Sequence, residues 1–322
     1  MSVKPASSID TDNLSVRAAW LHYAGGYTQA DVAKKLGVTS LKAHRLITRA
    51  NKDGLVKFHI DGEVAECAAL ENRLAAAFEL EYCEVVPDLY EQGLPLRALG
   101  IAGAQYLKRV LENPDIPSIG IGHGRTLAAC VHHLPHIQTS DKAIVSLLGG
   151  FSRKFSANPH DVIHRLAERT GASAFVMPIP FFVNTIENKQ IILEQFGIAE
   201  VLDLARNTAI KVVGIGTVDE ESSIRTNDMV DTNEMQAVNQ AGGVGEMLGH
   251  FFDDDGSIVD TDLSDRTMGL APDDLHTAKL LAVAGGSSKI RAINAILKSR
   301  LLRGLITDER TARALIDSQG NT

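Results

Sequence analysis

A glycine-rich segment holds the clearest candidate for small-molecule chemistry. It reads Ile119-Gly-Ile-Gly-His-Gly-Arg-Thr-Leu127 and joins an apolar run to a helix-forming one. Glycine lets a backbone approach a ligand closely, and the N–H groups at the start of a helix can hold a phosphate or a polyol hydroxyl. A glycine turn that only packs a helix against a sheet would look the same. The ligand contacts predicted here are Gly122, His123, Gly124, Arg125 and Thr126.

Two glycine pairs extend this candidate site. Gly149-Gly150 follows the apolar run 143–148, and Gly285-Gly286 follows the run 279–284. Ligands of open α/β sheets bind at the carboxyl ends of the strands, so both pairs are expected near one crevice. Lys289 lies in the first turn of the next helix, where its ammonium can reach an anion. The further ligand contacts predicted are Gly149, Gly150 and Lys289.

A second group of residues has the spacing of a helix-turn-helix. Two helix-forming stretches, 29–36 and 40–51, are separated by a short turn at Gly37. The apolar residues spaced to fill the core between them are Val32, Leu36, Val38, Leu46 and Ile47. The opposite face of the last helix can enter the major groove, where Arg45 or Lys42 can donate to guanine. The residues predicted to read DNA are Ser40, Leu41, Lys42, His44, Arg45 and Arg49.

The distribution of charge also favours DNA as a partner. Residues 1–60 contain nine Lys or Arg and four Asp, a net of +5, which leaves −13 for the rest of the chain. A basic module attached to an acidic lobe is typical of a DNA-binding domain joined to a regulatory or enzymatic one. The lysines expected to hold DNA phosphates are Lys34, Lys35, Lys52 and Lys57.

Flanking elements complete an N-terminal domain over residues 1–62. A helix over 14–24 precedes the motif, and residues 55–60 follow it as a strand-like wing. Residues 63–322 are predicted to form the effector-binding domain, beginning with a linker helix over 63–80. Leu70, Leu74 and Phe78 form an apolar stripe on this helix, which fits either a dimer seam or packing on its own domain.

The larger domain alternates strand-like and helical segments. The apolar runs are 82–86, 118–121, 143–148, 174–177, 210–215 and 279–284, and helical segments lie near 96–112, 125–134, 160–170 and 197–207. Such alternation predicts parallel strands joined by crossover helices. The predicted fold class is therefore α/β, with a winged helix-turn-helix before a doubly wound sheet.

Composition excludes several other classes of protein. The hydrophobic fraction of 44% and the charged fraction of 22% are those of a soluble globular protein. No apolar run is long enough for a membrane span, and the first residues do not resemble a signal peptide, so a cytoplasmic location without membrane contact is expected. The three cysteines, Cys67, Cys83 and Cys130, are expected to be free thiols.

Two other patterns, a histidine cluster and an aspartate run, resemble metal sites but lack features that such sites require. His132, His133 and His136 have helical spacing, but Pro135 interrupts the helix and no carboxylate follows closely. The run 253–256, Asp-Asp-Asp-Gly, lacks the alternating ligands of a calcium loop. We therefore expect neither a metal nor a cofactor.

These motifs together resemble the SorC family of sugar-binding transcriptional regulators, over nearly the whole chain. The likeness rests on residues 28–38 with Arg45-Leu46, on Gly54-Leu-Val56, on Gly122–Thr126 and on Leu148-Gly-Gly150. Its most specific part is Ala284-Gly-Gly-Ser-Ser-Lys-Ile-Arg-Ala-Ile293, followed by Leu305-Ile-Thr-Asp308. Within the family, the chain is most similar to regulators of erythritol catabolism.

The resemblance implies a repressor of a carbohydrate or polyol catabolic operon. Such a protein binds a palindromic operator as a homodimer or homotetramer, and a sugar, polyol or sugar phosphate modulates it. The effector domain would be similar to phosphosugar isomerases, with the ligand loop at 122–126 and the phosphate-contacting lysine at Lys289. The chain departs from the family at Leu41-Lys42, where Arg-Pro is frequent, and at His123, where Trp is common.

Two alternatives belong to other classes of function. A phosphosugar isomerase with an accessory helix-turn-helix would need a carboxylate base, and the available candidates are Asp219, Glu220 and Glu221. These residues also fit a solvated acidic loop. A scaffold whose N-terminal module binds protein is disfavoured by the basic third helix. We expect a DNA-binding regulator and not an enzyme.

Overall fold

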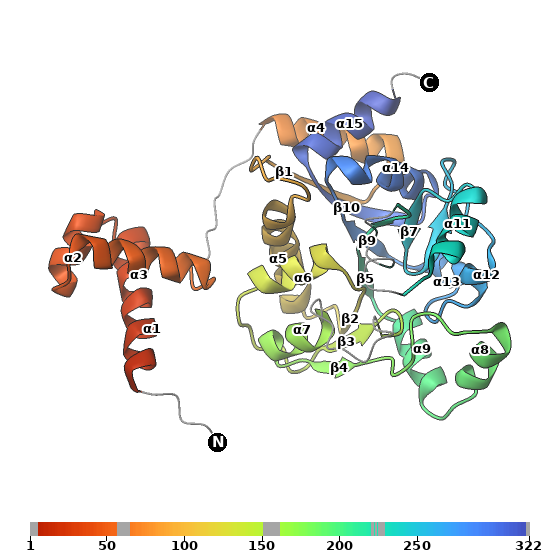
Figure 1. The fold of residues 1–322 in the computed structure, drawn as a ribbon, viewed down its shortest axis with the longest axis horizontal. Coiled ribbons are helices and arrows are strands. Elements are labelled where there is room, and N and C mark those ends of the chain that lie inside the picture. The colour runs from red at the N-terminus through yellow and green to blue at the C-terminus, as the bar shows by residue number, and fades with distance from the viewer. Residues whose placement is uncertain are drawn as a thin grey trace. The chain divides into compact units, whose positions relative to one another are not determined.

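The chain forms two compact units, Met1–Gly62 and Glu63–Thr322. The computed structural model describes residues 6–56, 65–150, 162–219, 222, 224 and 229–319. Figure 1 shows the order of the elements within each unit. Because the two units are separate bodies, we treat each by itself.

The N-terminal unit is helical. Its elements are α1 (Ala6–Ala19), a π-helical turn (Trp20–Ala24), α2 (Gln29–Leu36) and α3 (Ser40–Lys52). Thr28 caps α2 by accepting the Asp31 N–H at 3.2 Å, and Gly37 ends that helix in the left-handed region at φ 64°. Thr39 caps α3 by accepting the Lys42 N–H at 3.3 Å. These caps explain why the two helices begin and end where the sequence predicts.

The core of this unit holds the predicted apolar residues. Val32, Leu46 and Ile47 are buried, and Leu36 and Val38 are partly buried against them. Leu55 and Val56 do not form a strand. The remainder of the expected wing, with Lys57, lies outside the described residues.

The cap on α3 can be tested by its effect on stability. Thr39→Ala should lower the free energy of unfolding of the N-terminal unit by about 1 kcal/mol, because the Lys42 N–H loses its acceptor. Urea unfolding of the full chain can follow Trp20, the single tryptophan, which belongs to this unit. Thr48→Ala, an exposed change inside the same helix, is the matched control and should cost nothing. Equal losses from both changes would contradict the assignment of the cap.

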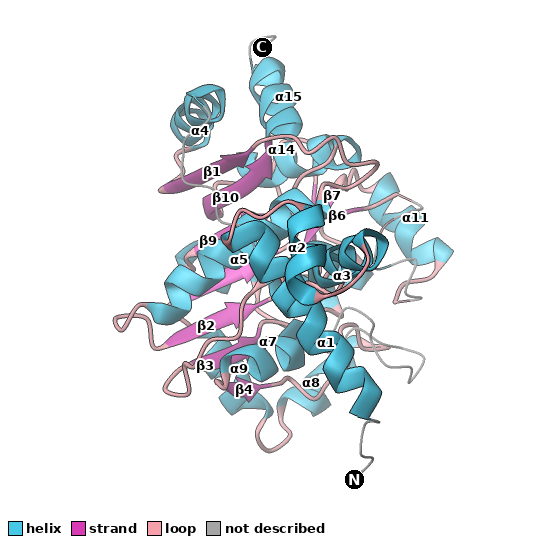
Figure 2. Cartoon of the chain, turned by 90° about the vertical axis from the view of Figure 1, so that its left-hand side faces the viewer, coloured by secondary structure: helices cyan, strands magenta, loops and turns pink. Residues whose placement is uncertain are grey.

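A seven-stranded sheet forms the centre of the second unit, and Figure 2 shows its strands in magenta. All six strand pairs are parallel. In spatial order the strands are β1 (Tyr82–Val86), β10 (Leu302–Asp308), β9 (Leu280–Val283), β5 (Ile210–Val213), β2 (Ser118–Ile121), β3 (Ala143–Ser146) and β4 (Ser173–Phe175).

Helices cover both faces of this sheet, so the strands are buried on two sides. Neighbouring strand residues enter different cores: Val212 joins one hydrophobic cluster and Val213 the other. The helices on the Val212 side are α5 (Leu96–Glu112), α6 (Arg125–His133) and α7 (Val162–Thr170). Those on the Val213 side are α4 (Ala65–Phe78), α14 (Ile290–Lys298) and α15 (Glu309–Gln319). The predicted doubly wound α/β fold is confirmed.

The apolar stripe of the linker helix packs on its own unit. Leu70, Leu74 and Phe78 of α4 are buried in the same cluster as residues of α14 and α15. Helix α4 contacts β1 and α15. Between the two alternatives that the sequence left open, the structure therefore supports packing within the domain.

Further elements were not predicted from the sequence. A small antiparallel sheet consists of β6 (Gly216–Thr217), β7 (Gly245–Met247) and β8 (His250–Phe252). Strand β10, which pairs with both β1 and β9, was also missed. The helices not predicted are α8 (Ile186–Leu193), α11 (Thr232–Gln240), α12 (Asp262–Asp265) and α13 (Pro272–Thr277). Helix α9 (Ile198–Arg206) matches the helical segment expected near 197–207, and a short 3-10 turn (Ser287–Lys289) precedes α14.

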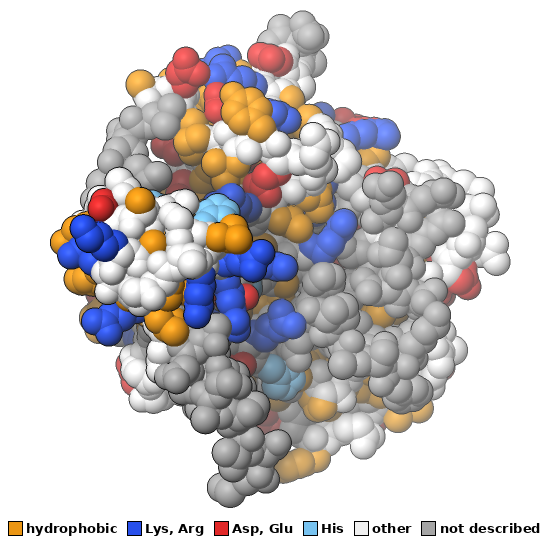
Figure 3. Space-filling model, turned by 60° about the vertical axis from the view of Figure 1, so that its left-hand side comes forward, with side chains coloured by type: hydrophobic (Ala, Val, Ile, Leu, Met, Phe, Trp, Pro, Cys, Tyr) orange, Lys and Arg blue, Asp and Glu red, His pale blue; other side chains and the backbone are white. Residues whose placement is uncertain are grey.

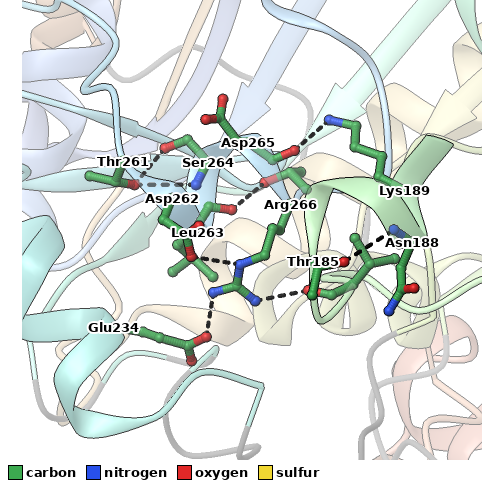
Figure 4. A network of polar contacts seen from close by, with 12 residues as sticks. Thr185, Asn188, Lys189, Glu234, Thr261, Asp262, Leu263, Ser264, Asp265 and Arg266 are labelled. Carbon is green, nitrogen blue, oxygen red and sulfur yellow. Dashed lines mark hydrogen bonds and ion pairs between the residues drawn. The ribbon is translucent and has the colours of Figure 1, made fainter.

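One buried arginine ties three of these segments together, as Figure 4 shows. The Arg266 guanidinium pairs with Glu234 of α11 at 2.5 Å and with Asp262 of α12 at 2.9 Å, and it donates to the Val183 carbonyl at 2.8 Å. Its side chain is only 5% exposed. Glu234 also closes a capping box with Asp231 at the start of α11. The charge of Arg266 is therefore compensated inside the domain.

The structure bears on the expectations about membrane spans, about the cysteines and about the run at 253–256. Within the described residues, no helix is long and apolar enough to cross a membrane. Cys67, Cys83 and Cys130 are free thiols, and two of them are buried. The carboxylate of Asp253 accepts N–H groups of its own turn, while Asp254 pairs with Arg291 at 2.5 Å.

Candidate functional site

The order of the strands creates a crevice between β2 and β5. From β2 the chain continues outward to β3 and β4, and it then returns to the other side of β2 as β5. Connections that leave two neighbouring strands in opposite directions open a space at their carboxyl ends. The glycine-rich loop after β2 and residues Gly214–Gly216 after β5 meet at this place.

A cavity in this crevice collects most of the predicted ligand residues. Its volume is about 50 Å³. Six of the predicted contacts line it: Gly122, His123, Gly124, Arg125, Thr126 and Lys289. Seven lining residues were not predicted: Leu148, Phe181, Gly214, Ile215, Gly216, Glu246 and Leu248. The sequence therefore located the glycine-rich loop and Lys289 but not the seven other residues of the lining.

The start of α6 faces this cavity. Gly124 precedes the helix with φ 122°, a conformation that favours glycine, and no side chain caps the helix. The first N–H groups of a helix lack partners within it and carry the positive end of the helix dipole. With Arg125 and Thr126 in the first turn, the loop offers several donors to an anion.

Lys289 supplies a further positive charge to the lining of the cavity. Its Nζ donates to the Ile215 carbonyl at 2.5 Å. Burial and the nearby Arg125 guanidinium lower the pKa of Lys289 to about 8, against the opposing effect of Glu246 and Asp219. An anionic ligand group would compensate the ammonium, which has lost much of its contact with water.

Glu246 is the carboxyl group of the cavity and was missed from the sequence. It lies on β7, and its Oε1 accepts the Gly249 N–H at 2.7 Å. Burial raises the pKa of Glu246, and the charge of Lys289 opposes that shift. A Cβ at Gly216 would lie 2.5 Å from Glu246 Oε2, so that glycine makes room for the carboxyl group. Glu246 can accept hydrogen bonds from ligand hydroxyls.

Two predicted glycines lie beyond the cavity lining. The Gly149 N–H donates to the Met268 carbonyl at 2.9 Å, and the Gly150 N–H donates to the Ile179 carbonyl at 2.7 Å. Leu148, which precedes them, lines the cavity in their place. Gly149 and Gly150 as ligand contacts stay a prediction.

A buried carboxylate positions the turn that carries Lys289. Asp308, at the end of β10, accepts the Gly286 N–H at 3.0 Å and the Thr311 N–H at 3.0 Å. A Cβ at Gly285 would lie 2.1 Å from Asp308 Oδ2, which explains the glycine there. Residues 284–289 and Asp308, two parts of the most specific family likeness, are therefore one structural unit.

The site can bind a small molecule that is anionic at one end and hydroxylated at the other. Lys289, Arg125 and the start of α6 provide the cationic side. Glu246 and the glycine backbone provide hydrogen-bonding groups for hydroxyls. This set of groups fits a phosphorylated sugar or polyol.

The predicted DNA-reading face is open in the N-terminal unit. All six side chains on it are exposed: Ser40, Leu41, Lys42, His44, Arg45 and Arg49. Arg49 pairs with Asp53 at 3.2 Å, so its guanidinium is partly engaged. Figure 3 shows a group of Lys and Arg side chains on the face turned toward the reader. The side chain of Arg45 points outward, as a base-reading role requires.

Asp219, the one described residue among the carboxylates proposed for an isomerase, does not line the cavity. Asp219 is exposed, accepts the Thr217 hydroxyl at 2.9 Å and is absent from the lining residues. Glu220 and Glu221 lie outside the described residues. Among the lining residues, Glu246 is the one carboxylate.

Known proteins match this chain along almost its full length. The Sugar-bind family model, described as "Putative sugar-binding domain", matches residues 62–317. The erythritol catabolism regulatory protein EryD of Brucella abortus (strain 2308) is 52% identical over 305 residues, which cover 95% of this chain and 96% of that protein. The transcriptional regulator LsrR of Enterobacter sp. (strain 638) is 31% identical over 318 residues, covering 97% and 95%.

Solved structures agree with this picture. The full-length sorbitol operon regulator SorC from Klebsiella pneumoniae matches with a TM-score of 0.70 and 26% identity, covering 95% of this chain and 99% of that one. A structure described as "Putative Sugar-Binding Domain of Transcriptional Repressor from Vibrio fischeri" matches with a TM-score of 0.70 and 27% identity, covering 79% of this chain and 100% of that one.

Proposed function

Because the chain belongs to the SorC family of sugar-binding transcriptional regulators, we propose that it represses a polyol catabolic operon and releases its operator when a phosphorylated polyol binds. The effector would occupy the cavity between β2 and β5. The close similarity to a regulator named for erythritol catabolism favours a four-carbon polyol phosphate.

The observation that carries this proposal is the position of Lys289. It places a half-buried ammonium on the same cavity lining as the uncapped start of α6. Two sources of positive potential that face one small space support binding of a phosphate. The Glu246 carboxyl group, on the same lining, supports recognition of hydroxyls.

Operator binding would require two copies of the helix-turn-helix. A palindromic operator presents two half-sites, so we propose a homodimer or homotetramer. An effector that binds one conformation of the larger domain better would change the spacing of the recognition helices. A coupling free energy of about 1–3 kcal/mol changes operator affinity by about 5 to 150-fold.

Isothermal titration with erythritol 4-phosphate and erythritol, followed by operator binding with each compound present, tests the proposed effector. We expect erythritol 4-phosphate to bind and to weaken the protein–DNA complex. Unchanged operator affinity with every polyol phosphate would overturn the sensing role. The relatives are named as regulators, and we propose that the chain does not turn over its ligand. Product formation that is lost on Glu246→Gln would contradict this.

Arg45 is the residue whose loss should weaken sequence-specific binding. We expect Arg45→Met to lower affinity for the operator by about 10 to 100-fold, because a guanidinium bound to guanine contributes about 1–3 kcal/mol of discrimination. Fluorescence anisotropy with DNA from upstream of the gene measures this, and a random duplex measures non-specific binding.

Arg17→Met is the matched control for this measurement. Arg17 is exposed on α1 of the same unit, away from the recognition helix in sequence. Its loss should affect operator and random DNA equally, through charge alone. An Arg45→Met protein with an unchanged ratio of operator to random affinity would refute the assigned base contact.

A further inference from the structure

The larger domain contains a second cavity that the effector site does not use. It measures about 360 Å³, which lies within the range of small-molecule sites. Its walls come from α8, α9 and the stretch 258–272, all in the Glu63–Thr322 unit. Much of the lining is apolar, contributed by Leu193, Leu202, Ile258, Met268, Leu270 and Pro272. No residue that lines this cavity also lines the effector cavity.

Two polar side chains stand out on this lining. Lys189 is half-buried, and its Nζ donates to the main-chain carbonyl of Asp265 at 2.8 Å, as Figure 4 shows. Burial lowers the pKa of Lys189, because the charged form has lost water. His250 is buried and its Nε2 bonds the Leu270 carbonyl at 2.8 Å. That bond assigns the ring proton to Nε2, which leaves Nδ1 as an acceptor.

The lining of this cavity carries two cationic side chains, Lys189 and Arg206, and two carboxylates, Asp260 and Asp265, which are exposed to water. The Arg206 guanidinium already pairs with Asp203 at 2.7 Å and with Asp274 at 3.1 Å. The Lys189 ammonium donates to the main-chain carbonyl of Asp265, and the nearby Asp265 carboxylate opposes the lowering of its pKa. Burial lowers the pKa of His250, against the opposing effect of the hydrogen bond to the Leu270 carbonyl and with a smaller lowering contribution from Lys189, so burial favours the neutral ring. Because water screens the two exposed carboxylates more than the half-buried Lys189 ammonium, that ammonium beside an apolar surface favours a small monocarboxylate.

The two cavities share a wall. Leu248 lines the effector cavity and His250 the second one, and Gly249 lies between them in the turn from β7 to β8. A Cβ at Gly249 would lie 2.4 Å from Thr267, which lines the second cavity, and 3.1 Å from Phe181, which lines the first.

A second contact joins the same two walls. Leu148 of the effector cavity forms a β-bridge with Gly269 of the second one. The turn at Gly249 also bonds to both sides, because its N–H donates to Glu246 and its carbonyl accepts the Thr267 hydroxyl at 3.0 Å. Closely packed walls transmit displacements, so occupancy of one cavity should alter the other.

We propose that the cavity lined by Lys189 and His250 is a regulatory site for a small monocarboxylic acid, whose carboxylate pairs with Lys189 and whose apolar body contacts the floor. A hydroxyl on that body would donate to His250 Nδ1. The acid acts on the effector cavity through the turn at Gly249. Binding of the acid at this site does not depend on the proposed function. Only the coupling between this site and the effector cavity rests on the proposed function.

Isothermal titration of the full chain with hexanoate, 3-hydroxybutyrate and 1-hexanol tests the site. We expect one hexanoate per chain, with binding at least about tenfold tighter than that of 1-hexanol, because the alcohol cannot pair with Lys189. Lys189→Met should lower the affinity for hexanoate by a similar factor. Lys279→Met, which removes an exposed lysine of the same domain, should leave it unchanged.

Several results would overturn the inference. They are an absence of hexanoate binding, equal binding of hexanoate and 1-hexanol, and equal losses from both lysine variants. The comparison of the acid with the alcohol uses the unmodified protein, so it stands even where Lys189→Met fails to fold.

The coupling is tested with inorganic phosphate as the probe of the effector cavity. Saturating hexanoate should change phosphate affinity by at least about threefold, and phosphate should change hexanoate affinity by the same factor. Lys289→Met should abolish phosphate binding and keep hexanoate binding, which separates failure of the effector assignment from failure of this one. Identical phosphate affinity with and without bound hexanoate would refute the coupling.

Discussion

Lys289→Met lowers the affinity for erythritol 4-phosphate by about 100-fold in our expectation, equivalent to about 2.7 kcal/mol. Methionine keeps the approximate length of the side chain, and the change removes the ammonium that lines the cavity together with the start of α6. The loss should be large because the ammonium is half-buried, where water screens its attraction to a phosphate only weakly. Isothermal titration measures the affinity directly.

The same lysine predicts a dependence of binding on pH. Since the pKa of Lys289 is lowered to about 8, the fraction of charged ammonium falls as pH rises through that value. A phosphate binds the charged form, so affinity should decrease by about tenfold between about pH 7 and pH 9. This decrease should disappear in Lys289→Met.

Lys279→Met serves as the control for charge. It removes an exposed lysine from the same domain, and binding of erythritol 4-phosphate should be unaffected. Should Lys289→Met retain full affinity, or should both variants lose it equally, the phosphate site assigned to Lys289 would be wrong.

Arg266→Met lowers the free energy of unfolding of the larger domain by about 3–5 kcal/mol in our expectation. The guanidinium is 5% exposed, and its partner Glu234 is 17% exposed. Removal of the arginine leaves the Glu234 carboxylate poorly solvated and without its positive partner, and it also removes the donor to the Val183 carbonyl. Urea unfolding followed by far-ultraviolet circular dichroism measures the loss.

A double variant distinguishes two contributions to the lost stability: the Glu234 charge without Arg266, and the lost packing of the arginine side chain. Glu234→Gln in the Arg266→Met background should recover a substantial part of the stability, because glutamine carries no charge and can still accept at the start of α11. Arg303→Met is the matched control, since Arg303 and Glu81 are exposed and 4.0 Å apart, and it should cost less than about 1 kcal/mol. Equal losses for Arg266→Met and Arg303→Met would rule out the stabilising role of the buried pair.

Elements with local signals could be predicted closely. Thr28, Gly37 and Thr39 set the ends of α2 and α3, because a cap depends on residues a few positions apart. The strands β1, β2 and β5 appear in the sequence as apolar runs because both faces of the sheet are covered.

Other features carried no such signal. Strand β10 includes Arg303 and Gly304, which interrupt its apolar run. Glu246 lies on a three-residue strand whose hairpin depends on positive φ at Leu248 and Gly249. A short hairpin of this kind is stabilised by what it packs against, so its sequence alone did not indicate that Glu246 reaches the ligand cavity.

By itself, the sequence determined α2, α3, most strands of the large sheet, the exposed basic face of α3 and the residue types at the ends of β2 and β9, because these follow from periodicity, capping and charge along the chain. Only the tertiary structure decided that Gly124, Lys289 and Glu246 share one cavity. The physical reason is that β5 returns to the far side of β2, and this choice of neighbour depends on the packing of the whole sheet.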